Sequence, residues 1–132
     1  MLQKKTAILS GLVTVLILII AGCSKTATIV VNPGSSITTE MSYAKDITPI
    51  FEKKCALSGC HASGGKSPDL TTANSYKSLN GGSYIKAGDP DNSVIMAWLT
   101  GKISPVMPMG SGPDQDINAK IYAWIKQGAK NN

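Results

Sequence analysis

The residues best suited to chemistry lie in the short segment at positions 55–61, which reads CALSGCH. Cys55 and Cys60 are followed at once by His61, the only histidine of the chain. These residue types can attach a haem covalently, because two thiols add across the vinyl groups of the porphyrin and the histidine ligates the iron. The usual signature places two residues between the cysteines, whereas this chain places four. The longer spacer can still reach both vinyl groups if it bulges.

Two other interpretations of the same segment remain open. Cys55 and Cys60 could form a disulfide in an oxidising compartment. Together with His61 they could also hold zinc, but a closed structural zinc site takes four ligands, and no third cysteine lies near them in the sequence. The segment alone therefore predicts haem attachment, with a disulfide as the main alternative and a metal site as the third.

The amino-terminal residues predict export and a lipid anchor. Two lysines precede an apolar stretch over residues 7–20, which is short for a membrane-spanning helix of roughly 20 residues. The stretch ends in Ile-Ala-Gly-Cys, a sequence typical of the site at which bacterial lipoproteins are cut. We therefore predict a lipoprotein signal peptide over residues 1–22 and lipid attachment at Cys23, where several acyl chains would give stable anchoring. The alternative is an uncleaved signal anchor in which Cys23 has no special role.

The remaining chain is predicted to contain a tether and one small domain. Residues 23–42 are rich in threonine and serine and include Pro33-Gly34, as expected of a flexible tether between a membrane and a folded domain. Residues 43–132 are then a single domain of modest size. Because Cys23 would carry lipid, the exported chain retains one pair of cysteines for the domain.

The charge of the chain does not indicate nucleic-acid binding. The net charge of +5 comes from lysine alone, and removal of the two lysines in the signal peptide lowers it to +3. The other lysines are scattered along the chain and form no basic stripe. We therefore predict a solvated surface and no nucleic-acid partner.

The elements that must position the cysteines and the histidine are predicted to be helices. The first is expected from about Asp46 into Cys55, with Asp46 or Thr48 as its cap and Pro49 in its first turn. Three of its apolar residues share one face: Ile47, Ile50 and Phe51. Such a helix delivers the cysteine pair at its carboxyl end.

Further helices are predicted after this segment. One begins at Ser93 and ends at Gly101, and its apolar face holds Val94, Ile95, Trp98 and Leu99. Another runs from about Asp114 to Gln127, with Gly128 just beyond its end, and its apolar face holds Ile117, Ile121, Trp124 and Ile125. A short helix is expected near residues 73–79. No segment alternates as a strand would, so the sequence predicts an all-α domain with long irregular loops.

The order of these parts resembles that of class I c-type cytochromes, in particular small bacterial monohaem domains. The resemblance spans residues 43–129 and is carried by the Cys-His segment and by four further motifs: residues 46–51 (DITPIF), residues 88–93 (GDPDNS), Met107-Pro108, and residues 124–129 (WIKQGA). It implies a cytochrome c-like fold with three to four helices around one covalently bound haem c. The long spacer and Ser67, where the family usually has glycine, depart from the pattern.

The resemblance also implies roles for individual residues. Cys55 and Cys60 would form the thioether bonds, and His61 would be the proximal ligand of the iron. Pro68 would offer its backbone carbonyl to the other ring nitrogen of the histidine, which orients the ring and strengthens it as a ligand. Met107 would be the distal ligand.

The methionines of the exported chain allow a choice of sixth ligand. Met41 precedes the first predicted helix, and Met96 lies within a helix, where a packing role is expected. Met107 and Met109 lie in a loop stiffened by prolines, which can hold a thioether on iron without a large loss of entropy. We favour Met107 over Met109. The alternative is that both are loop or core side chains and that the iron has five ligands.

Ligation by His61 and Met107 would fill both axial positions of the iron and leave no place for a substrate. We therefore expect an electron carrier and not an enzyme. The sequence predicts a monohaem c-type cytochrome that carries single electrons in the bacterial cell envelope. One alternative is a haem-based sensor or peroxidase-like module with an open distal site, and another is a disulfide-stapled binding lipoprotein without haem.

The expected partners follow from this function. They are redox proteins of the envelope, which the sequence does not identify, and the membrane, through lipid on Cys23. A third possibility is that the chain is a free-standing copy of a domain that is more often fused to an enzyme. We expect a monomer, with its domain in the periplasm or at the cell surface. Ser24 and Lys25 include no acidic retention residue, which favours the outer membrane.

Overall fold

The computed structural model describes residues 33–132, and this part of the chain is helical and contains no strand. Its α-helices are α2 (Thr48–Lys54), α3 (Ser75–Gly81), α4 (Val94–Leu99) and α5 (Gln115–Lys126). Shorter helical turns are η1 (Pro33–Ser36), η2 (Tyr43–Ile47) and η3 (Pro90–Asn92). The predicted all-α class is thus confirmed for these residues. No helix within residues 33–132 reaches the length and apolar character that a membrane span requires. The predicted signal peptide and Cys23 lie outside the described residues.

The first helical segment begins earlier than the sequence predicts. The chain enters a π-helical turn at Tyr43, and Ser42 is its cap. The Ser42 hydroxyl accepts the backbone N–H of Lys45, and the backbone N–H of Ser42 donates to the Asp46 carboxylate at 2.8 Å. The Thr48 hydroxyl donates to the Tyr43 carbonyl at 3.0 Å. The predicted cap at Asp46 or Thr48 is therefore wrong, because both side chains bond back toward the preceding turn.

The helix α4 is shorter than predicted, and its face differs at two positions. Ser93 precedes it, but the hydroxyl makes no capping bond and donates instead to the Asp89 carbonyl at 2.9 Å. Val94, which was assigned to the apolar face, is 41% exposed, while Met96 is buried. The difference arises because six residues make less than two turns, so the buried face follows the contact with α5.

The last helix, α5, matches the sequence analysis closely. The Asp114 carboxylate accepts the backbone N–H groups of Asp116 and Ile117, both at 3.1 Å, and so caps the amino end. Gly128 follows the carboxyl end with φ of 101°, the left-handed conformation expected there. All four predicted apolar residues of this helix are buried: Ile117, Ile121, Trp124 and Ile125.

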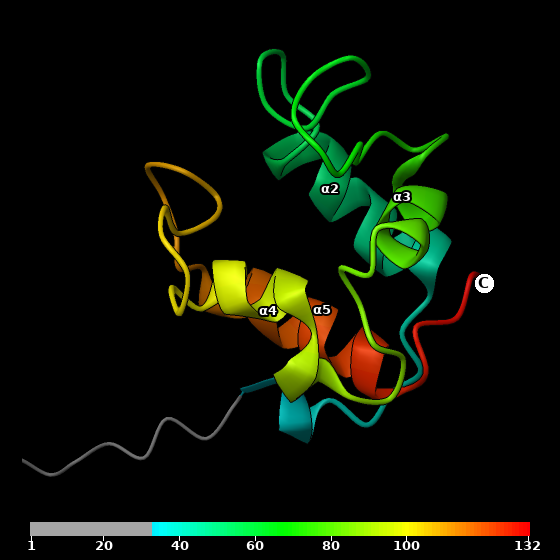
Figure 1. Ribbon diagram of the computed structural model, residues 1–132. Helices are drawn as coiled ribbons and strands as arrows, with labels where there is room; N and C mark the ends of the chain where they lie inside the picture. The colour runs from blue at the N-terminus through cyan, green and yellow to red at the C-terminus, as the bar shows by residue number, and fades with distance from the viewer. Residues whose placement is uncertain (1–32) are drawn as a thin grey trace, which may run out of the picture.

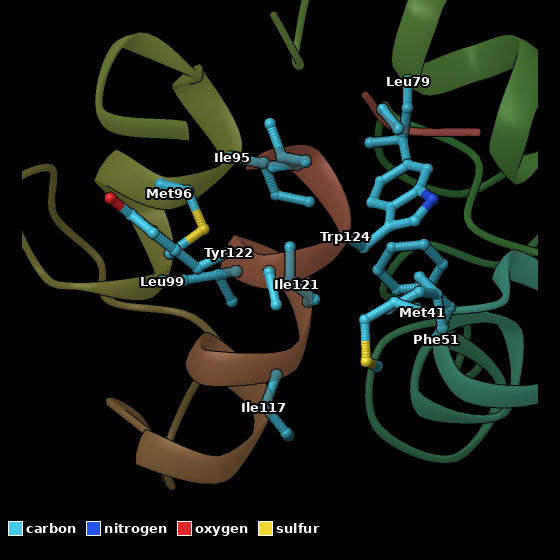
Figure 2. Close-up of a cluster of buried hydrophobic side chains, with 14 of the residues drawn as sticks. Met41, Phe51, Leu79, Ile95, Met96, Leu99, Ile117, Ile121, Tyr122 and Trp124 are labelled. Atoms are coloured by element: carbon cyan, nitrogen blue, oxygen red, sulfur yellow. The ribbon is translucent and has the colours of Figure 1, made fainter. Parts of the chain in front are cut away.

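The core forms around α5, with α4 on one side and the segment η2–α2 on the other. Figure 2 shows Leu99 and Met96 of α4 beside Ile121 and Tyr122 of α5. On the other side, the ring of Tyr43 lies with its centroid 5.1 Å from that of Trp124 and 6.4 Å from that of Phe51. Such aromatic contacts join the segment η2–α2 to α5.

The second half of the predicted tether contacts the domain. The segment 33–42 runs along α5, where η1 packs on the helix (Figure 1). The Gln127 amide fixes the rest of it, since its Nε2 donates to the Thr39 carbonyl at 2.9 Å and its Oε1 accepts the Met41 N–H at 2.7 Å. Among the described residues, packing against the domain therefore already begins at η1, before position 43, the predicted start of the domain.

The close approach of η1 to α5 makes Gly34 a sensitive position. A methyl group on Gly34 would lie 2.5 Å from the carbonyl oxygen of Ala119 and 2.7 Å from Cβ of Tyr122, so the two segments would have to separate. We expect Gly34→Ala to lower the free energy of unfolding by about 1–3 kcal/mol, measured by denaturant titration. Gly81→Ala is the matched control, because a methyl group there meets open space. An equal effect of the two substitutions would contradict the proposed packing.

Candidate functional site

A cavity of about 490 Å³ opens between the Cys-His segment and the loop over residues 100–114. Figure 1 shows these two loops at the edge of the molecule, in green and in orange, beyond the ends of α2 and α4. Apolar side chains from the core form the inner wall: Phe51, Leu70, Ile95, Leu99 and Ile121. A cavity of this volume and lining is of the kind that binds small molecules and cofactors.

The spacer between the two cysteines folds into a closed bulge. The N–H of Cys55 still donates to the Phe51 carbonyl at 2.9 Å, so the helical path continues to the first cysteine. The chain then turns at Gly59, which has φ of 78°, and the N–H of His61 returns to the Cys55 carbonyl at 3.1 Å. The four-residue spacer therefore forms a bulge, which a spacer of this length would need in order to reach both vinyl groups. The bulge brings the histidine back beside the first cysteine.

His61 is held by backbone carbonyl groups on one side of its ring. Its Nδ1 lies 3.0 Å from the carbonyl oxygen of Pro68 and 3.1 Å from that of Lys66. Both neighbours are acceptors, so Nδ1 donates a proton to them, and in the neutral imidazole the lone pair then lies on Nε2. No described residue bonds to Nε2, and His61 lines the cavity. The contact with Pro68 that the resemblance implies is thus present.

The two cysteines line the same cavity but differ in burial. Cys55 is half-buried against the core, and burial followed by the proximity of Cys60 raises the pKa of the Cys55 thiol to about 11. Cys60 is exposed, and both thiols are free in the structure. Within residues 33–132, no three side chains of His, Cys, Asp or Glu gather where they could hold a metal ion.

The methionines are divided between the cavity and the core. Met41 and Met96 are buried in the core, and neither lines the cavity, which confirms the packing role expected for Met96. Met107 and Met109 both line the cavity, on the loop opposite the Cys-His segment. Met107 is half-buried against the core, whereas Met109 is 62% exposed. The structure therefore places Met107 in the better-shielded position of the two.

Two aromatic residues of the cavity wall were not predicted as site residues. Tyr84 and Trp98 are half-buried and line the cavity, and neither the Tyr84 hydroxyl nor the Trp98 indole N–H bonds to another described residue. Each combines a large apolar ring with one hydrogen-bond donor. Trp98 was assigned only to an apolar helix face, and Tyr84 lies in a loop without periodicity, so neither cavity position could be predicted from the sequence.

Comparison of the chain with protein-family models, curated proteins and solved structures found no match.

The bulge between the cysteines depends on the backbone conformation of Gly59. A methyl group at this position meets no atom within 4 Å, so any effect of substitution comes from the left-handed φ alone. We expect Gly59→Ala to lower the free energy of unfolding by about 1 kcal/mol, measured by thermal unfolding. Gly59→Asn should cost less, because asparagine tolerates this conformation better than alanine. A larger loss with asparagine would show that the bulge is not formed in this way.

Proposed function

We propose that this protein is a monohaem c-type cytochrome that carries single electrons. The proposal rests chiefly on one observation, which is that His61 and Met107 line the same apolar cavity from opposite loops, with Cys55 and Cys60 beside the histidine. The cysteines supply two thiols, the histidine supplies a free Nε2, and the methionine supplies a thioether. This is the donor set that covalent haem attachment and axial ligation require.

The arrangement of the helices supports a cytochrome c-like fold as part of this proposal. The Cys-His segment follows directly on α2, and the loop with Met107 connects α4 to α5. The segment η2–α2 and the last helix, α5, meet through the rings of Tyr43 and Trp124. This order agrees with the resemblance of the sequence to class I c-type cytochromes.

Each of these residues would have its own role in holding haem. Each cysteine thiol would add across a vinyl group, so that a carbon–sulfur bond forms and the proton moves to the neighbouring carbon. The Pro68 carbonyl orients His61 and increases its strength as a donor. Tyr84 and Trp98 have unpaired donors that suit the two carboxylates of haem. When bound, haem supplies an iron that alternates between the ferric and ferrous states.

The same geometry favours electron transfer over catalysis. His61 and Met107 would occupy both axial positions, which leaves no open site for a substrate. With haem in place, the apolar inner wall would keep water from the buried side of the cavity, and this would lower the reorganisation that accompanies a change of charge. Cys60 and Leu57, which is 48% exposed, lie at the rim, so an electron would enter and leave on this side.

The envelope location and the lipid anchor remain part of the proposal. Roughly ten residues would separate a lipid on Cys23 from the contact that Gly34 makes with α5, which spans at most ~35 Å. A redox partner within the envelope would therefore meet the domain close to the membrane.

The first test is an intact mass of the full chain, purified from membranes of a host that matures c-type cytochromes. We expect loss of residues 1–22, added acyl chains and one added haem. The variant Cys55→Ala/Cys60→Ala, produced in the same host, should carry the lipid but no covalent haem. A wild-type mass with lipid, without haem and short by two hydrogens would show a Cys55–Cys60 disulfide and contradict the proposal.

The second test separates the two methionines of the loop. We expect Met107→Ala to abolish the low-spin spectrum of the ferric protein and to lower its reduction potential, because the thioether ligand raises that potential. Met109→Ala is the matched control and should leave both unchanged, since Met109 is largely exposed. If Met107→Ala changes neither the spectrum nor the potential, the distal site is open and a sensor or peroxidase-like module is the better interpretation.

A further inference from the structure

The loop that carries Met107 is attached to the carboxyl end of α4. A helix leaves its last four carbonyl groups without partners inside the helix. Here the loop supplies two of the missing donors, because the N–H of Ile103 bonds to the Ala97 carbonyl and the N–H of Met107 bonds to the Trp98 carbonyl, both at 3.1 Å. The backbone position of Met107 therefore depends on where α4 ends.

The last of these carbonyl groups is held by a side chain of α5. Asn118 donates from Nδ2 to the Leu99 carbonyl at 2.9 Å, and this bond is buried. Asn118 is only 7% exposed and lies one turn before Ile121, which lines the cavity. Its amide therefore fixes the end of α4 to α5 next to the carbonyl that holds Met107.

An asparagine is a costly residue at this buried position. Its Oδ1 has no hydrogen-bond partner among the described residues, although a buried polar atom without a partner destabilises a fold. A leucine branches at Cγ as asparagine does and carries no such atom. The bond to Leu99 is thus the one contribution of Asn118 that an apolar residue could not make.

We propose that Asn118 is a positioning residue for the distal ligand, an inference that rests on the proposed function. By fixing the Leu99 carbonyl, it holds the end of α4 in the place from which Met107 reaches the iron. Loss of this bond would let the end of α4 and the attached loop move together. Met107 would then spend more time away from the iron, while His61, on the opposite loop, would be unaffected.

An added ligand for ferric iron measures this freedom. Imidazole can bind only when Met107 is displaced, so its apparent affinity is proportional to the fraction of molecules in which the sixth position is open. We expect Asn118→Leu, in the full-length haem-loaded protein, to bind imidazole about tenfold more tightly than the wild type. Met107→Ala sets the upper limit of this change, because it removes the competing ligand altogether.

Gln127→Leu is the matched control for Asn118→Leu. Gln127 is also an amide of α5 that bonds to backbone groups of another segment, but these groups belong to Thr39 and Met41 rather than to α4. Its loss should weaken the fold while leaving the imidazole affinity within about twofold of the wild type. Thermal unfolding of both variants shows whether their stabilities are comparable.

The possible outcomes separate the inference from the proposed function. An Asn118→Leu protein with wild-type imidazole affinity, or an equal gain in Gln127→Leu, would overturn the positioning role alone. If Asn118→Leu does not accumulate, Asn118→Ala is titrated in its place, and failure of both to fold would also overturn the positioning role. A wild-type protein without covalent haem, or Met107→Ala with unchanged imidazole affinity, would instead overturn the proposed ligation and the inference with it.

Discussion

The hydrogen bond between His61 Nδ1 and the Pro68 carbonyl is the contact on which the candidate site depends. It places the proton of the neutral imidazole on Nδ1 and holds the ring of the only histidine of the chain at the wall of the cavity. The return of the His61 N–H to the Cys55 carbonyl fixes the same residue from the other direction. The side chain and the backbone of His61 are thus both held by bonds within the protein, so the site needs little reorganisation to accept a ligand.

The second half of the site is held in a different way. Met107 lies on a loop without regular structure, and its backbone N–H bonds to the Trp98 carbonyl at the end of α4. The cavity is consequently bounded by one loop fixed through its own bonds and by another fixed through a neighbouring helix. Ligation by a strong imidazole and a weaker thioether would correspond to this difference in rigidity.

The sequence was sufficient where a local pattern determines the structure. The start of α5 near Asp114, the left-handed Gly128 beyond its end and the buried face of the helix follow from residue type and spacing, and all are present. It was insufficient where distant segments compete for a residue. Ser93 bonds to a loop instead of capping α4, and the cavity role of Tyr84 depends on tertiary packing that carries no periodicity. For the same reason, the contact of residues 33–42 with α5 could not be predicted from their composition.

The docking of η1 on α5 has a consequence for how the protein would search for partners. Figure 1 shows η1 at the opposite end of the molecule from the Cys-His loop. With Cys23 lipidated, the domain would be confined to a thin layer above the bilayer, and its rim would tend to point outward. The domain and its membrane-bound partners would then diffuse in two dimensions, and they would meet at a high effective concentration. The short tether would therefore restrict the domain to partners that lie at a matching height above the membrane and also have a complementary surface.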